Sequence, residues 1–335
     1  KVFSVLLAVL MLTAFVPLAI ETPVEAAGNV YYVAKTGSDS NPGTEALPWR
    51  TIQKAANTLT AGDTVYVKAG TYNEQVVPAN SGSSGSGYIT YKNYGSDSVT
   101  ITGSGIDLGY SNSGSTKGVF YINGKSYINV EGFTITGSTC FGVSVYGVCD
   151  HINIRNLKVN DTRSSGIYVS SIWNDFSRKP TNIVVSGCEV WNTNYGADQE
   201  SITLIAVNNF EVANCKVHDV KGSGSGNFPV QNAIDAKSGC NNGSIHNNEV
   251  YNAMDGIYID TGGAPSSNIK IYSNKVYNCK GAGIALCSER SPYSPITDVD
   301  IYNNIIHNNV LGFLADNYTR FHCNFRFFNN TLYFN

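Results

Sequence analysis

The chain has 335 residues, of which 42% are hydrophobic and 14% charged, and its net charge is −3. This composition excludes a disordered chain, and without a visible basic patch nucleic acid is not an expected partner. Uncharged polar residues are abundant, together with 33 Gly and 21 Tyr. Carbohydrate-binding surfaces often have such a composition, but so do many all-β proteins, so composition alone does not choose a function.

The N-terminal segment predicts export. KVFSVLLAVLMLTAFVPLAI is a charged start followed by a continuous apolar run, and small residues follow near Ala26 and Ala27. We therefore expect residues 1–27 to be a secretory signal peptide. An uncleaved anchor is the alternative, because the run is nearly long enough to span a bilayer. After cleavage we expect a protein that is secreted or at the cell surface, with no membrane contact.

Residues 28–78 are interpreted as an N-terminal cap. Thr51 to Leu59 has the pattern of a short amphipathic helix, and a strand is expected after it. Such a helix would cover the open end of the repeats that follow. Residues 79–118 are rich in Ser and Gly and contain short strands such as TYKNY and VTITG, so we expect irregular early coils there.

A repeated nine-residue unit dominates the rest of the chain. Each copy begins with alternating residues, turns at Asn or Gly and resumes with an apolar residue. The copies are YINVEGFTI from Tyr127, HINIRNLKV from His151, NIVVSGCEV from Asn182, NFEVANCKV from Asn209, NGSIHNNEV from Asn242, NIKIYSNKV from Asn268, DVDIYNNII from Asp298 and NFRFFNNTL from Asn324.

A second short strand follows in most repeats, for example GIYV from Gly166 and GIYI from Gly256. Equivalent strands once per coil, without helical patterns between them, predict an all-β right-handed parallel β-helix. We expect one domain over residues 28–335, with coils over residues 79–335. Because the chain stops at TLYFN, after the first part of a coil, we expect its C-terminal end to be truncated.

The seventh position of the unit predicts a ladder at a turn. It is Asn in four successive copies, at positions 248, 274, 304 and 330, where stacked amides can satisfy one another. In earlier copies it is Cys188 and Cys215. These are expected to be buried thiols, with a disulfide between coils as the alternative.

Two families resemble this sequence. YYVAKTGSDSNPGT followed by PWRTIQKAANTLTAGDTVYVKAGTYNE is similar to the N-terminal cap of secreted β-helix polysaccharide-active proteins, notably family 9 pectate lyases. The repeats SPITDVDIYNNIIHNN and GFLADNYTRFHCNFRFFNNTLYFN resemble archaeal disaggregatase-related proteins. That second resemblance implies cleavage of a cell-surface heteropolysaccharide.

The pectate lyase resemblance implies calcium-binding aspartates on two coils and a catalytic Lys one coil further on. This sequence departs from that pattern at most of these positions. Asn232 stands where an Asp is expected, Asp255 is kept, Met254 and Tyr258 replace two ligands, and Ala285 replaces the Lys. The family 9 reaction is therefore not expected to occur with this set of residues.

Polar residues gather in the columns formed by the second strand. On three neighbouring coils these columns contain acids, an amide and a lysine, whereas elsewhere they are small or apolar. The residues are Glu200, Asn232, Asp235, Lys237, Asp255 and Asp260. Turn chemistry would explain Asp255 and Asp260, each of which comes before a Gly or Thr-Gly. It does not explain Asp235 and Lys237 inside a strand, so we interpret the group as a site.

The spacing favours a glycoside hydrolase. Asp235 and Asp260 are expected roughly 8 Å apart at Cα, and Asp255 and Glu200 about 9.6 Å apart. Inverting glycosidases need about 6.5–9.5 Å between carboxyl groups to admit water. One acid would protonate the leaving oxygen, another would activate water, and Lys237 would bind an anionic sugar or hold an Asp ionised. This reaction needs no cofactor.

A calcium-dependent polysaccharide lyase is the alternative enzyme. In that reaction Asp235, Asp255 and Asp260 would be Ca²⁺ ligands and Lys237 the base. A surface protein that only binds glycan is the non-enzyme alternative, with its carboxylates serving as turns. In all three cases the expected partner is an extracellular or cell-surface polysaccharide.

Further residues are candidates for substrate binding. Trp191, His218 and Tyr251 belong to an outward aromatic column that shares coils with the acids, and aromatic rings can stack on sugars or on each other. Tyr258 and Asn232 stand in the polar columns. Arg290, in a loop between coils, could contact an acidic glycan.

Overall fold

The computed structural model describes residues 28–110, 115–172, 175–196, 199–222, 230–288, 294–317 and 323–335. The expected signal peptide, residues 1–27, lies outside these ranges. Within them, no helix has both the length and the apolar character needed to cross a bilayer.

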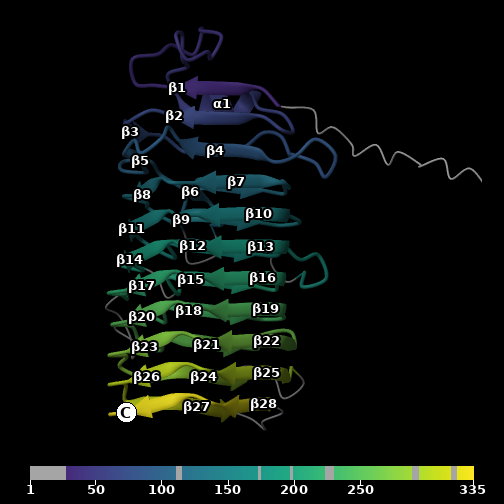
Figure 1. Ribbon diagram of the computed structural model, residues 1–335, viewed down its shortest axis with the longest axis vertical. Coiled ribbons are helices and arrows are strands. Elements are labelled where there is room, and N and C mark those ends of the chain that lie inside the picture. The colour runs from purple at the N-terminus through teal and green to yellow at the C-terminus, as the bar shows by residue number, and fades with distance from the viewer. Residues whose placement is uncertain are drawn as a thin grey trace, which may run out of the picture.

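The fold is a parallel β-helix, as the repeats predicted. Successive coils stack along one axis, and corresponding strands of each coil pair in parallel to build three sheets (Figure 1). We call these sheets A, B and C, in the order in which the chain visits them in each coil. The nine-residue unit covers a strand of sheet A, a turn and a strand of sheet B, and the second short strand belongs to sheet C.

Sheet A has eleven strands: β1 (Val30–Val33), β2 (Thr64–Val67), β4 (Ile89–Asn93), β7 (Ile128–Glu131), β10 (Asp150–Arg155), β13 (Thr181–Ser186), β16 (Asn208–Ala213), β19 (Asn241–His246), β22 (Ser266–Tyr272), β25 (Ile296–Tyr302) and β28 (Cys323–Phe328). Sheet B has ten: β3 (Gly70–Asn73), β5 (Val99–Thr102), β8 (Thr134–Thr136), β11 (Lys158–Thr162), β14 (Glu189–Thr193), β17 (Lys216–His218), β20 (Glu249–Tyr251), β23 (Lys275–Tyr277), β26 (Ile305–His307) and β29 (Thr331–Tyr333). Sheet C has eight: β6 (Gly118–Asn123), β9 (Phe141–Tyr146), β12 (Ile167–Ser170), β15 (Ile202–Ile205), β18 (Ile234–Lys237), β21 (Ile257–Asp260), β24 (Ala282–Ser288) and β27 (Leu311–Asn317).

The expected helix near the N-terminus is α1 (Ile52–Thr58), which lies at the N-terminal end of the stack (Figure 1). Thr51 is its N-cap, and the Thr51 hydroxyl accepts a hydrogen bond from the Lys54 N–H at 3.1 Å. Ile52, Ala55 and Ala56 are buried in the same core as the first strands. The apolar side of the helix therefore extends the core beyond the first coil.

The turn from sheet A to sheet B fixes the shape of each coil. From β7 to β29 it always has two residues. The first takes a positive φ, for example 54° at Asn247 and 56° at Asn303, which Asn tolerates better than most residues. The second residue points into the core. The Asn-Asn pairs in the sequence therefore combine a first Asn that adopts the positive φ with a second Asn whose side chain is in the core.

The asparagine ladder predicted at this turn is present. Asn248, Asn274 and Asn304 are buried, and each side-chain N–H donates to the next Asn oxygen at 2.9–3.0 Å. The same oxygens accept backbone N–H groups of the preceding coil, as Asn274 does from Asn248 at 3.0 Å. The amides thus satisfy buried backbone groups that the bend would otherwise leave without partners.

Connections from sheet B to sheet C vary in length from coil to coil. Most have three to five residues, but residues 103–117, 194–201 and 219–233 form connections of fifteen, eight and fifteen. The last two lead directly into β15 and β18, which are neighbours in sheet C.

The eight cysteines are free thiols, and seven are buried. Cys188 and Cys215 stack in the ladder column as buried thiols, the first of the two alternatives that the sequence allowed. Their side chains occupy the positions that the Asn amides hold in later coils.

Replacing Asn274 by Ala should destabilise the protein by about 2–4 kcal/mol, because a buried N–H of Asn248 and a buried carbonyl of Ile245 lose their partners. Urea unfolding followed by circular dichroism measures the change. Asn324→Ala, on the exposed side of β28, is the control and should shift stability by less than about 0.5 kcal/mol. Equal effects of the two variants would contradict a structural role for the ladder.

Candidate active site

The register of sheet C brings the predicted polar residues together. Asp235 pairs with Thr203 on one side and Tyr258 on the other, and Lys237 pairs with Ile205 and Asp260. These are the columns that the repeats predicted. We call Glu200, Asp235, Lys237 and Asp260 the sheet C cluster.

Lys237 is the centre of this cluster. Its ammonium lies 2.7 Å from Oε1 of Glu200 and 3.3 Å from Oδ2 of Asp235. Glu200 is the last but one residue of the eight-residue connection, and Asp235 follows the fifteen-residue one. Two long connections on neighbouring coils therefore lead to the acids that bind this lysine.

Two residues that sequence reasoning did not single out support Glu200. The Thr203 hydroxyl donates a hydrogen bond to Oε2 of Glu200 at 3.1 Å. The Ser165 hydroxyl is hydrogen-bonded to the Thr203 hydroxyl at 2.9 Å. Both stand in the polar columns, at the positions of Asp235 and Glu200 on neighbouring coils. The sequence columns therefore contained these two residues. Small hydroxyl side chains at such positions are also common on a strand surface that has no catalytic or binding role, so they did not indicate a site.

The cluster is largely removed from solvent. The Asp235 side chain is fully buried, and those of Glu200 and Lys237 are 8% and 15% exposed. Neither carboxyl oxygen of Asp235 has a hydrogen-bond partner among the described residues, apart from the ionic contact with Lys237. Asp235 thus lies beneath the Glu200–Lys237 ion pair.

Burial and neighbouring charge set the protonation of this group. Burial raises the pKa of Asp235 well above its ordinary value, and the nearby Glu200 and Asp260 carboxylates raise it further against the effect of Lys237. Burial lowers the pKa of Lys237, but the surrounding acids outweigh it, so the pKa of Lys237 is well above its ordinary value. A protonated Asp235 beside a positively charged Lys237 follows from these directions.

Asp260 is also buried, at 4% exposure, one coil from Lys237. Its Oδ1 accepts a hydrogen bond from the Gly262 N–H at 2.7 Å. Such a bond favours the ionised carboxylate. Asp260 therefore combines the turn role that its Thr-Gly neighbours indicated with a place in the cluster.

Asp255 and Asn232 have a different role. Oδ1 of Asn232 accepts the Asp255 N–H at 3.1 Å, and Oδ1 of Asp255 accepts the Ala282 N–H at 2.6 Å. The two side chains link three successive coils at the entry to sheet C. Burial raises the pKa of Asp255. The contacts make these residues part of the turn rather than of the group around Lys237.

The remaining sequence candidates lie elsewhere. Tyr258 is buried on the outer face of sheet C, in a small apolar cluster with Ala282, Ala285 and Cys287. Arg290 lies outside the described residues.

Trp191, His218 and Tyr251 do not face the cluster, because they project from sheet B. There they form a stack with nearly parallel rings, in which His218 is 6.1 Å from Trp191 and 4.8 Å from Tyr251. The His218 ring also lies 2.8 Å from Asp219 and 3.4 Å from Glu189. These contacts give the three residues a role in packing.

The aspartates do not fit a calcium ion. Oδ2 of Asp235 is taken by Lys237, Oδ1 of Asp255 by a backbone N–H, and Asp255 lies in the turn. Among the residues that the structure describes, no group of three or more His, Cys, Asp or Glu has the spacing of a metal site. We therefore assign no calcium ligands to this set.

Comparisons with known proteins agree with this architecture. A family profile described as "Pel9A-like, right handed beta helix region" matches residues 31–200, and one described as "Right handed beta helix region" matches residues 117–335. The chain belongs to the Pel9A-like right-handed β-helix family. This places the cap resemblance found in the sequence within a recognised family.

Two curated relatives match parts of the chain. The uncharacterized protein YwoF of Bacillus subtilis is 28% identical over 307 residues, which cover 84% of this chain and 63% of the relative. The pectate lyase PEL9 of Emericella nidulans is 32% identical over 103 residues, which cover 29% of this chain and 25% of the relative. The chain thus spans less than two thirds of either relative.

Solved structures share the fold at low identity. Pectate lyase Pel9A has a TM-score of 0.64 at 13% identity, covering 92% of this chain and 79% of that one. The GH136 lacto-N-biosidase of Eubacterium ramulus has a TM-score of 0.53 at 14% identity, covering 92% and 68%. An alginate lyase of Paenibacillus has a TM-score of 0.53 at 18% identity, covering 81% and 95%. One architecture therefore carries both lyases and hydrolases.

Lys237→Met should lower stability by about 3–5 kcal/mol at neutral pH, because it leaves Glu200 as a buried charge without its partner. Thermal unfolding at pH 7 measures the effect. The matched control is Lys275→Met, whose partner Glu249 is 40% exposed and which should cost less than about 1 kcal/mol.

Asp235→Asn should change how stability depends on pH. Since the pKa of Asp235 is raised by folding, the wild-type protein should lose stability as pH rises above the ordinary Asp range near 4, and level off above the raised pKa. The variant should lack this part of the loss. Parallel pH profiles of unfolding free energy for the two proteins would show instead that Asp235 ionises normally.

Proposed function

We propose that the protein hydrolyses an extracellular polysaccharide at the outer face of sheet C, with Asp235 as the proton donor. One observation carries the proposal: a fully buried carboxyl group, whose pKa is raised, lies 3.3 Å from a lysine inside a strand. Burying such a group costs stability, and the fold gains no visible hydrogen bond from it among the described residues. A carboxylic acid that keeps its proton near neutral pH is what a general acid requires.

Asp260 is the proposed base. It stands opposite Lys237, so it is one coil and two residues from Asp235, or roughly 8 Å at Cα. That separation suits the inverting mechanism, in which water is activated between the two carboxyl groups. The backbone N–H of Gly262 favours the ionised form that would accept a proton from water. Asp235 would protonate the glycosidic oxygen at the same time.

Lys237 is proposed to bind substrate rather than to act as a base. A lysine whose pKa is raised keeps its proton, whereas β-elimination by a lyase needs a neutral amine to remove the α-proton. This contrast favours hydrolysis over the lyase alternative. Because Asp235 lies beneath the Glu200–Lys237 pair, substrate must separate that pair, and a sugar carboxylate would replace Glu200 on the ammonium.

The substrate class rests on the family. Pel9A, the lacto-N-biosidase and the alginate lyase are named for cleaving glycans, and the signal peptide expected at residues 1–27 would bring this protein to the same extracellular polymers. A cell-surface heteropolysaccharide, as implied by the disaggregatase-like repeats, is the proposed substrate. No cofactor takes part in the proposed reaction.

Asp235→Asn and Asp260→Asn should each reduce turnover by about 10²–10⁴-fold while leaving the fold and glycan binding intact. Reducing ends and the ultraviolet absorbance of unsaturated uronates should be recorded in parallel on acidic polysaccharides. Asp298→Asn is the matched control, since it is exposed and Asn268 occupies the same position one coil earlier; it should keep full activity.

Each other outcome of this assay has a definite meaning. Products that absorb as unsaturated uronates and vanish with EDTA would replace the hydrolase by a calcium-dependent lyase. Glycan binding without product from the wild type would make the protein a binding scaffold. Full activity of Asp235→Asn would remove Asp235 from the mechanism.

A further inference from the structure

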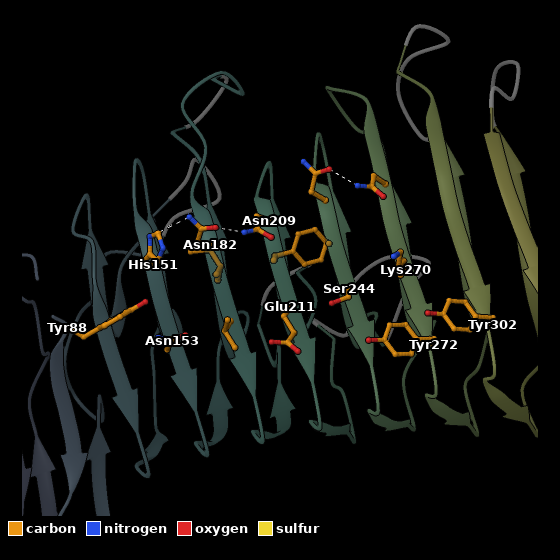
Figure 2. Close-up of a pocket in the computed structure, with 16 residues that line it drawn as sticks. Tyr88, His151, Asn153, Asn182, Asn209, Glu211, Ser244, Lys270, Tyr272 and Tyr302 are labelled. Atoms are coloured by element: carbon orange, nitrogen blue, oxygen red, sulfur yellow. Dashed lines mark hydrogen bonds between the residues drawn. The ribbon is translucent and has the colours of Figure 1, made fainter. Parts of the chain in front are cut away.

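A second feature lies on the outer face of sheet A, away from the sheet C cluster. It is a groove of about 700 Å³ that crosses the strands from β10 to β25 (Figure 2). Its volume is within the range of ligand sites, about 300–1,000 Å³. Nothing in the proposed hydrolysis uses it.

The floor of the groove is made of small side chains. Ser244 stands between Glu211 and Lys270 in one outward column, with Val184 next to Glu211 on the other side. Gly243, beside Ser244, belongs to the inward column, where the Phe210 ring occupies the place of its missing side chain. Because neighbouring coils carry long residues in the same column, the short ones leave a hollow between them.

A row of amides forms one side. Asn182, Asn209, Asn242 and Asn268 occupy equivalent positions near the start of their strands, each with φ between 53° and 56°. They are joined in two pairs: Asn209 donates to Asn182, and Asn268 donates to Asn242 at 2.7 Å. Between the pairs, Asn242 donates instead to Asn208 at 2.8 Å. An amide has two N–H donors and two acceptor lone pairs, so these bonds leave each Asn able to bind a further hydroxyl.

Aromatic residues form the opposite side. Tyr272 stacks on Tyr302 at 5.0 Å and on His246 at 4.6 Å, so the ring faces are used in the stack and the hydroxyl edges are free to meet a ligand. Figure 2 shows Tyr272 and Tyr302 side by side near the ends of their strands, whereas His151, Asn182 and Asn209 lie near the starts of strands several coils away. Both sides therefore offer groups that exchange hydrogen bonds with hydroxyls.

The groove has little net charge. Among its lining residues Lys270 is the one Lys or Arg and Glu211 the one acid, so their formal charges cancel. Glu211 is also bound by His246 at 2.9 Å. A strongly anionic polymer would gain nothing here from electrostatic attraction, whereas a chain rich in uncharged hydroxyls would find partners along the whole groove.

We propose that this groove binds a neutral polysaccharide segment running parallel to the solenoid axis, without cleaving it. From β10 to β25 there are five steps between strands, which span about 24 Å, enough for several sugar rings. The amide row would bind hydroxyls on one edge of the sugar chain. The tyrosine hydroxyls would bind those on the other edge. The site holds the polymer on a face other than that of the sheet C cluster.

Affinity gel electrophoresis tests this proposal, with galactomannan and hydroxyethyl cellulose as neutral probes and polygalacturonate as the acidic one. The full chain should be retarded by at least one neutral probe. Ser244→Trp, which fills the floor, should weaken that binding at least tenfold. Thr134→Trp, at an outward position of β8 on sheet B, is the matched control and should bind like the wild type.

A milder variant guards against misfolding of Ser244→Trp. Tyr272→Phe keeps the ring stack and removes one hydroxyl, so binding should weaken about two- to tenfold with unchanged thermal stability. Asp235→Asn should bind neutral probes normally, which separates this site from the proposed reaction. No retardation by either neutral probe, or equal loss in Thr134→Trp, would overturn the proposal. Stronger binding of polygalacturonate through the same groove would also overturn it.

Discussion

The constant register of the parallel strands is the constraint on which the rest of this structure depends. A two-residue turn between sheets A and B repeats in coil after coil, and its second position holds Phe133 and Leu157 first, then two cysteines and then asparagines. The turn residue with positive φ and the ladder residue behind it prevent any slip, because a slip of one residue would exchange core and surface along a whole strand. Columns of side chains on the outer faces are a direct result.

The sheet C cluster buries charged side chains at positions where this fold usually buries apolar ones. On the same face, Tyr258, Ala285 and Cys287 form a small apolar cluster one or two coils away. Where β15 and β18 stand, that apolar packing is replaced by Glu200, Lys237 and a buried Asp235. An ion pair of this kind is weak evidence for stability, since apolar residues of similar size often serve as well. Its presence is better explained by what a protonated acid beside a fixed cation can do.

Much of this arrangement could be predicted from the sequence, because each coil repeats the same spacing. The columns of sheet C, the asparagine ladder and the capping helix all followed from periodicity and turn residues. The full burial of Asp235 could not be predicted, since it depends on the three-dimensional packing around the strand and not on the spacing of the repeat. The sequence offered both a turn role and a site role for Asp255 and could not choose between them, because an Asp before Gly has the same sequence in both. The prediction that Trp191, His218 and Tyr251 bind substrate beside the acids was based on shared coils. These residues project from another sheet, which the repeat spacing alone does not show.

The uneven connections between sheets B and C have a consequence for how such a protein can change. Because every strand is held by its neighbours above and below, a connection can grow from four residues to fifteen without moving the strands that it joins. Mutations that lengthen or exchange one connection are therefore insulated from the folding of the coil. Natural selection can therefore lengthen the connections beside a cluster such as this one while its acids keep their places in the strands.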